Sequence, residues 1–144
     1  MTVFCGTPQW RIELPRSWCA QHGPNNVAVY HPDGVGALQF SSYRKPQGLV
    51  TDVDLKEMAT GSEMNPVRHG EFEGFKQEQE DGDTWWLRWF LRADRFAVFV
   101  TYNCKVTERG REQNQIEKIL DSLTCPAIKA MAEQKVAPDC GGST

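Results

Sequence analysis

The sequence has few of the residue patterns that indicate a catalytic or metal-binding site. None of its five cysteines falls in a CxxC spacing, its three histidines form no HxH or HxxxH pair, and Ser41-Ser42 lies outside a GxSxG context. Zinc sites are built from such paired spacings, and GxSxG is the turn that presents the nucleophile of an α/β-hydrolase. The sequence therefore predicts no catalytic residues, no metal site and no cofactor, and we expect a protein that is not an enzyme.

The chain also lacks a membrane-spanning run and a secretory leader. Its longest apolar stretches fall short of the ~20 residues that cross a bilayer, and residues 1–6 have neither the basic nor the apolar part of a signal peptide. An odd number of cysteines fits free thiols better than a disulfide framework, although one pair could still form a bridge. We therefore expect a cytoplasmic protein with no membrane span.

Positive charge is in short supply, with 16 basic against 19 acidic residues and a net charge of -3. Nucleic-acid binders normally carry a basic surplus on one face, so this balance argues against a nucleic-acid partner.

A chain of 144 residues has the length of one ordinary domain. At this size roughly 68–70% of the unfolded surface can be buried, so the core needs no metal or disulfide to support it.

The most apolar stretch is residues 84–104, TWWLRWFLRADRFAVFVTYNC, which predicts a β-hairpin with a polar break at residues 92–95. Side chains alternate between the two faces of a strand. One face is uniformly apolar and is the predicted core: Trp85, Leu87, Trp89, Leu91, Phe96, Val98, Val100 and Tyr102. The opposite face is mixed: Trp86, Arg88, Phe90, Arg92, Ala97, Phe99, Thr101 and Asn103. A mixed face suits partial exposure, or cover by a helix or a partner.

Turn signals and changes of period divide the rest of the chain. Pro32-Asp33-Gly34 and Asp81-Gly82-Asp83 predict hairpin turns, and Thr51-x-x-Asp54 predicts a helix N-terminus. Further strands are predicted at residues 9–14, 27–31, 35–43 and 70–80, and helices at 52–60 and 112–123. The order β-β-β-α-β-β-β-α predicts an α+β fold, with one antiparallel sheet of about six strands and two helices packed on it. Residues 1–125 form the predicted domain, and residues 126–144 a tail that is partly helical or disordered.

Three motifs in this order resemble the PsbP/DcrB-like superfamily. Trp10-Arg11-Ile12-Glu13-Leu14-Pro15 is similar to its WxIxLP strand, Val100-Thr101-Tyr102 to the end of its last strand, and Ile119-Leu120-Asp121-Ser122-Leu123 to its IL-x-SL helix end. The resemblance covers about residues 8–125 and implies a non-enzymatic binding scaffold. Similar proteins include photosystem accessory subunits, a Ran-binding import factor, envelope lipoproteins, adaptors of type VI secretion effectors and small bacterial immunity proteins. No catalytic residue is carried over, and fold analogy alone does not fix function.

Two groups of residues are candidates for a partner-binding surface. The first is acidic and comprises Glu71, Glu73, Glu78, Glu80, Asp81 and Asp83. It either docks on a basic partner or is a solvated strand whose charges discourage aggregation. The second comprises Trp86, Arg88, Phe90 and Arg92. Trp and Arg are enriched at interface hot spots, but a helix could cover this face, or the Arg stems could pack over the aromatic rings.

The remaining titratable residues have structural interpretations. We expect His22, His31 and His69 to be solvated histidines beside turns, and Cys104 and Cys125 to be small core residues.

We therefore expect a non-catalytic protein-binding module whose partner is a toxin or a secreted effector. As a bacterial immunity protein it would neutralise a cognate toxin by stoichiometric binding through the acidic strand. As an adaptor or chaperone for a type VI effector it would use the apolar sheet face. A small-ligand-binding protein or an enzyme would instead show a deep pocket containing Cys or His. The oligomeric state does not follow from the sequence.

Overall fold

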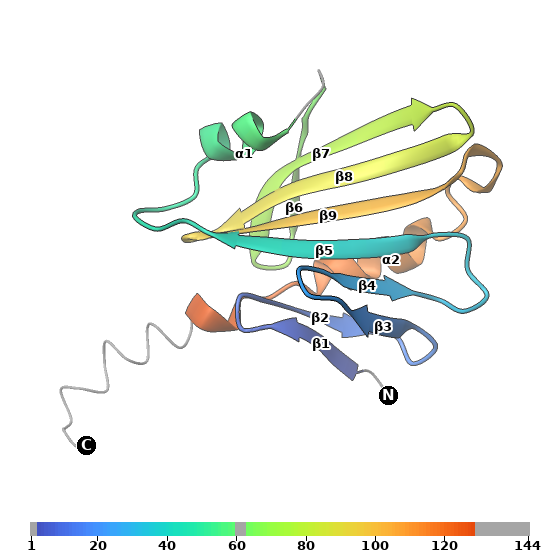
Figure 1. Cartoon of the computed structure of the whole chain (residues 1–144), viewed down its shortest axis with the longest axis horizontal. Coiled ribbons are helices and arrows are strands. Elements are labelled where there is room, and N and C mark those ends of the chain that lie inside the picture. The colour runs from blue at the N-terminus through green and yellow to red at the C-terminus, as the bar shows by residue number, and fades with distance from the viewer. Residues whose placement is uncertain (1–2, 60–62, 129–144) are drawn as a thin grey trace.

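The protein has an α+β architecture, shown in Figure 1 as a computed structural model that describes residues 3–59 and 63–128. A seven-stranded antiparallel sheet forms the body, and a separate two-stranded sheet lies beside it. The elements in chain order are β1 Val3–Thr7, β2 Trp10–Leu14, β3 Cys19–His22, β4 Val27–Tyr30, β5 Ala37–Arg44, α1 Asp52–Met58, β6 Asn65–His69, β7 Phe72–Asp81, β8 Thr84–Ala93, β9 Phe96–Lys105, a 3-10 turn at Val106–Glu108 and α2 Gln113–Asp121.

The large sheet consists of two meanders joined side by side. Its strand order is β3-β4-β5-β9-β8-β7-β6, so β5 from the first meander pairs with β9 from the second. The β8–β9 hairpin has the register Trp89↔Val100 and turns at Asp94 and Arg95. Asp94 has φ 56, a left-handed conformation that Asp tolerates in turns better than most residues. The predicted central hairpin and the predicted turns at Pro32-Asp33-Gly34 and Asp81-Gly82-Asp83 are confirmed.

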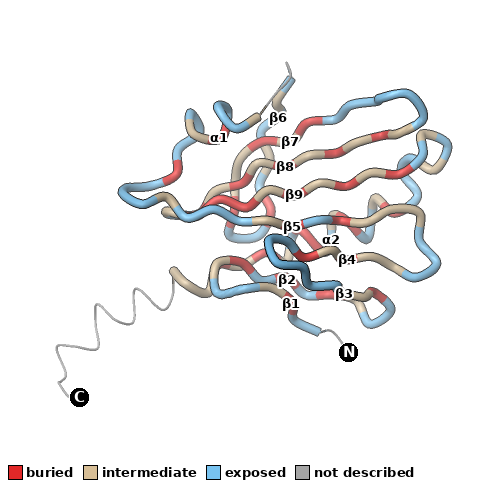
Figure 2. The backbone as a smooth tube through the Cα atoms, viewed as in Figure 1, coloured by how far each residue is buried: buried red, intermediate tan, exposed pale blue. Residues whose placement is uncertain are grey.

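The predicted core face of the hairpin is buried along its whole length. Every second residue of β8 is buried and those between are half-buried, an alternation that Figure 2 shows along both β8 and β9. On this side β1–β2 and α2 close the main core. The Trp10 ring stacks on Phe40 with centroids 4.6 Å apart, and α2 contributes Ile116, Ile119 and Leu120 to the same cluster.

A second, smaller core lies on the opposite face, beneath α1. It consists of Val50, Leu55, Phe75 and Ala97, and Figure 1 shows α1 over one end of β7 and β8. The predicted capping box fixes the start of this helix. Thr51 Oγ1 accepts from the Asp54 N–H at 3.2 Å, and Asp54 Oδ2 accepts from the Thr51 N–H at 2.9 Å. Hydrogen bonds from Lys45, first, and from Thr51 hold the pKa of the Asp54 carboxyl below its usual value.

The expectation of about six strands in one sheet is wrong, because the described residues form nine strands in two sheets. Strand 9–14 pairs with β1 in the small sheet instead of joining the large one. β3 escapes prediction because three of its four residues are exposed and show no alternation. β6 contains Pro66, which indicates a loop but is tolerated on an edge strand such as this one.

Both helices are shorter than predicted. α1 ends at Met58 and α2 spans Gln113–Asp121. Glu112 precedes the first turn of α2 as its N-cap, and Leu123 is buried beyond its end. No helix of the described ranges is long and apolar enough to span a membrane.

The cysteines in the described part of the chain are free thiols. Cys104 and Cys125 are buried free thiols, as predicted, and Cys5 and Cys19 are free as well. Cys140 and most of the predicted 126–144 tail lie outside the described residues.

Candidate protein-binding face

The side of the large sheet opposite the main core is covered by α1 at one end only. We call the uncovered remainder the open face. Its side chains are half-buried or exposed and come from β5, β7, β8 and β9: Gln39, Ser41, Tyr43, Gln79, Trp86, Arg88, Phe90, Phe99, Thr101 and Asn103. Within this list Arg88 is the one charged side chain. At the end of the sheet far from α1, the register also puts Asp81, Thr84 and Lys105 on this side. The centre of the open face therefore consists of aromatic and neutral polar groups around Arg88, with further charges at its far end.

Trp86 and Arg88 form a stacked pair on β8. The Arg88 guanidinium carbon lies 4.7 Å from the centroid of the Trp86 ring, and its Nη1 donates to Gln79 Oε1 at 2.8 Å. This is the predicted alternative in which an Arg packs over an aromatic ring. Among residues 3–59 and 63–128, Arg88 forms no ion pair with a carboxylate. The pair therefore presents a positioned cation beside a large ring.

An apolar depression adjoins this pair. Tyr43, Met58, Phe90 and Phe99 line it, and it has a volume of about 370 Å³. Phe90 and Phe99 meet edge to face with ring centroids 6.0 Å apart. Tyr43 and Met58 each expose 39% of their surface. Exposed apolar groups gathered in one place, next to polar ones, are typical of surfaces that bind other molecules.

Arg92 belongs to the covered end of the sheet. Its Nε donates to Asp52 Oδ1 at 2.7 Å, and its Nη2 lies 3.1 Å from Glu73 Oε2. Asp52 is the first residue of α1, so Arg92 and Glu73 attach the helix to the sheet. The structure thus separates Arg92 from Trp86 and Arg88, which are half-buried on the open face, and from Phe90, which packs at the edge of the second core.

The six acidic candidates do not form one surface. Glu78 and Glu80 pair with Leu87 and Trp85, on the main-core side of the sheet, whereas Glu73 lies on the other side. Asp81 and Asp83 are exposed at the β7–β8 turn. Alternation along β7 explains this separation, because even-numbered and odd-numbered residues point to opposite faces.

Several of these carboxylates have partners within the fold. Glu71 Oε1 accepts from the Cys125 N–H at 2.8 Å, and Glu78 Oε2 accepts from the Trp85 indole N–H at 2.8 Å. Glu80 pairs with Arg109. Internal contacts explain their positions, although Glu71, Glu78 and Glu80 are also exposed. Within the described part of the chain, Asp81 and Asp83 are the members of the group without a side-chain hydrogen bond or ion pair.

One expectation about histidine is wrong. His69 is only 5% exposed and lies in β6, not in a solvated turn. Its Nδ1 is 2.8 Å from Asp121 Oδ1, which joins β6 to α2. Glu117, one helical turn before Asp121, brings a third potential ligand atom, and the three atoms lie within 4.8 Å of one another. The hydrogen bond alone accounts for the position of the His69 ring.

The buried thiols are not activated as nucleophiles. Burial raises the pKa of the Cys5, Cys104 and Cys125 thiols above the usual value. A nucleophilic cysteine requires the opposite shift, which a nearby cation or helix N-terminus supplies. These three cysteines therefore have the properties of small core residues.

A scan against protein-family models gives no match, and a search of curated proteins gives none either. Among solved structures, the fold is similar to a Bacteroides thetaiotaomicron VPI-5482 protein whose crystal structure has 1.50 Å resolution. The TM-score is 0.62 at 17% identity, over 81% of this chain and 44% of the other. This chain thus spans less than half the length of that protein, and a likeness at this identity shows the fold alone.

Proposed function

We propose that this protein is a non-catalytic protein-binding module whose interface is the open face. The observation that supports this most directly is the Trp86–Arg88 pair beside the apolar depression. Trp, Tyr and Arg are the residue types that dominate interface energetics, and they do so where a rigid scaffold presents them. Here they stand on the central strands of a sheet.

The chemistry of the open face defines the partner. The depression around Phe90 and Phe99 fits an apolar side chain, and Arg88 fits a carboxylate placed next to it, because its charge has no acidic partner among the described residues. A broad, shallow surface suits a protein better than a small molecule, which normally binds in a concave site. We therefore propose a protein partner with an apolar patch bordered by Asp or Glu.

Both biological roles expected from the sequence are roles for a binding protein. The open face favours the adaptor, which covers apolar segments of a client, and makes it the better supported of the two. The immunity role through an acidic strand depends on Asp81 and Asp83, since the other four acidic residues have internal contacts or face different sides. The PsbP/DcrB-like resemblance stays a prediction.

A site-specific crosslinking experiment tests this proposal. A photo-crosslinking residue at Thr101 samples the open face, and one at Lys118 on the exposed side of α2 is the positional control. The partner captured from host lysate is then purified and titrated against variants. We expect a 1:1 complex whose Kd rises at least tenfold in Trp86→Ala and Arg88→Glu. Lys118→Glu, which makes the same change in charge, should leave the Kd unchanged.

Three outcomes would overturn the proposal. A partner that binds Arg88→Glu as tightly as Lys118→Glu does not use the open face. Loss of binding only when Asp81 and Asp83 are both changed to Lys would move the interface to the acidic turn and favour the immunity role. Capture of nothing but a second copy of the chain would replace the proposed partner with self-association.

A further inference from the structure

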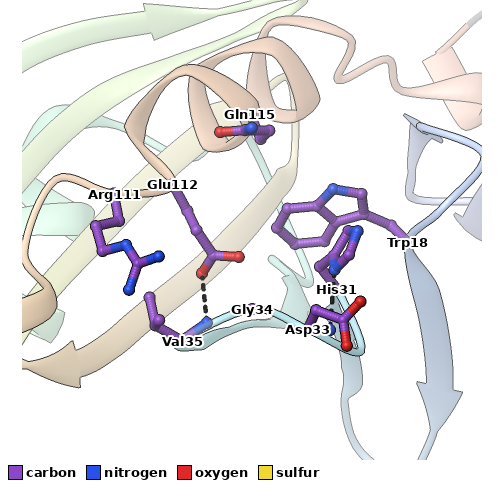
Figure 3. Close-up of a pocket in the computed structure, with 8 residues that line it drawn as sticks. All are labelled: Trp18, His31, Asp33, Gly34, Val35, Arg111, Glu112 and Gln115. Carbon is purple, nitrogen blue, oxygen red and sulfur yellow. Dashed lines mark hydrogen bonds between the residues drawn. The ribbon is translucent and has the colours of Figure 1, made fainter.

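A small pocket lies away from the open face, where the loop before β5 meets the start of α2. It has a volume of about 170 Å³ and contains none of the residues of the open face. Figure 3 shows Glu112 extending from the start of α2 into this pocket, with Trp18 and His31 along the far wall. None of the functional residues expected from the sequence lies here.

Glu112 has a buried carboxylate, and one of its two oxygens accepts hydrogen bonds from three donors. The residue is 8% exposed. Its Oε1 accepts from the Tyr102 hydroxyl at 2.7 Å, from the Gly36 N–H at 3.1 Å and from the Val35 N–H at 3.4 Å. Three donors on one oxygen fix the side chain in place.

The second oxygen of Glu112, Oε2, faces the pocket. No donor among the described residues reaches it. The pocket exists beside this oxygen because residue 34 is glycine: a Cβ at Gly34 would lie 2.3 Å from Oε2. Oε2 is not one of the fully buried atoms without a partner, so it is accessible from the pocket and can accept from a donor supplied from outside the protein.

The charges and rings around this position favour a cation. Arg111 also lines the pocket, where its guanidinium donates to Glu108 and lies close enough to Glu112 to interact with its charge. Asp33 lines the same pocket on the His31 side (Figure 3), so its lining has two carboxylates, Asp33 and Glu112, against one guanidinium, Arg111. Trp18 and His31 meet edge to face with centroids 6.2 Å apart, and the indole of a Trp is the aromatic ring that attracts cations best.

We infer that this pocket binds a primary alkylammonium group, held by Glu112 Oε2 and flanked by Asp33 and Trp18. An ammonium group carries three donors and a single charge in a compact volume, which suits a pocket of this size. The group belongs either to a free small amine or to a lysine side chain of a peptide. The inference does not depend on the open face, because the two surfaces share no residue.

Titration with two probes tests the inference on the full chain. Cadaverine represents a free amine, and Nα-acetyl-lysine methylamide represents a lysine side chain. Binding is followed by calorimetry and by the NMR signals of the Trp18 indole and the Gly34 and Val35 amides. We expect at least one probe to bind at millimolar concentration and to move these signals. Tighter binding of the lysine probe would identify a peptide source, and tighter binding of cadaverine a free amine.

Matched variants show whether Glu112 is the ligand. Glu112→Gln keeps an oxygen for Tyr102 and Gly36 but removes the charge, and we expect at least tenfold weaker binding. Glu57→Gln, on the exposed side of α1, removes the same charge and should bind normally. Asp33→Asn changes an exposed residue and should weaken binding severalfold, which keeps the test decisive if Glu112→Gln unfolds. No binding of either probe to the wild type, or equal binding by all variants, would overturn the inference.

Discussion

The Tyr102 hydroxyl donates a 2.7 Å hydrogen bond to Glu112 Oε1 in the interior of the protein. Tyr102 belongs to β9, and Glu112 immediately precedes α2. Because the same carboxylate oxygen accepts from the Gly36 N–H, just before β5, this contact joins two strands of the sheet to the helix that covers it. The hydrogen bond is therefore expected to contribute to stability and to the position of α2.

Removing this hydroxyl should destabilise the fold. In Tyr102→Phe a buried carboxylate loses its shortest hydrogen bond, and hydrogen bonds to charged groups contribute about 1.5–3 kcal/mol. We expect the free energy of unfolding, measured by urea titration, to fall by that amount. Tyr43→Phe, on the exposed open face, is the control and should change stability by less than ~0.5 kcal/mol. Equal stability of the two variants would contradict the role assigned to the contact.

Tyr102 should also make the fold less stable in alkaline solution. Burial, first, and the hydrogen bond to Glu112 raise the pKa of Tyr102 far above its usual 10. The folded state then retains the hydroxyl proton at a pH where the unfolded chain has lost it. This contribution is complete below about pH 10 and declines as the pH rises further. The stability difference between wild type and Tyr102→Phe should therefore shrink between about pH 9 and pH 11 in urea titrations. A difference that is constant over this range would contradict the prediction.

Two glycines with nearly the same backbone conformation should respond differently to alanine. Gly70 has φ 60 and Gly82 has φ 61. A Cβ at Gly70 would lie 2.0 Å from the Leu123 carbonyl oxygen, whereas a Cβ at Gly82 meets nothing within 4 Å. Gly82→Ala should cost only the left-handed strain, about 1–2 kcal/mol. Gly70→Ala should cost clearly more, because the β6–β7 turn must move away from Leu123. Thermal and urea unfolding of both variants provide the comparison, and equal losses would show that the contact with Leu123 relaxes freely.

Loss of the N-cap hydrogen bond should destabilise α1, the helix that covers the second core. Thr51→Ala removes the side-chain oxygen that accepts from the Asp54 N–H, and such a change costs about 1 kcal/mol. Thr107→Ala, at an exposed position after β9, is the matched control. Hydrogen exchange of the α1 amides should accelerate in Thr51→Ala alone. Unchanged exchange would mean that packing of Leu55, not the cap, holds the helix.

The parts of the fold that follow from local pattern could be predicted. The two faces of the β8–β9 hairpin, the Asp-Gly turn before it and the Thr51–Asp54 capping box each depend on residues that are close in sequence. Trp86 and Arg88 could also be placed on the face opposite the core, because alternation is a local property.

The parts of the fold that depend on contacts between residues far apart in the sequence could not be predicted. The exposed residues of β3 resemble a loop until β4 is known to lie beside them. The donors that orient Glu112 come from residues 35, 36 and 102, so the pocket had no local signal. His69 could not be recognised as buried either, since its partner Asp121 lies 52 residues further along the chain. In the same way, nothing in the sequence brings Tyr43 and Met58 to Phe90.

The junction between β5 and β9 has a consequence for synthesis of the chain. Leu38 pairs with Tyr102 and Arg44 with Phe96. One edge of β5 pairs with β4, but the other can pair with β9 only after residue 105 has left the ribosome. Until then the nascent chain exposes one unpaired edge of β5, and open edges of this kind recruit foreign strands. β9 is the last strand of the sheet to be synthesised, and its eight paired positions with β5 cover the edge that the β3–β4–β5 meander leaves open until then.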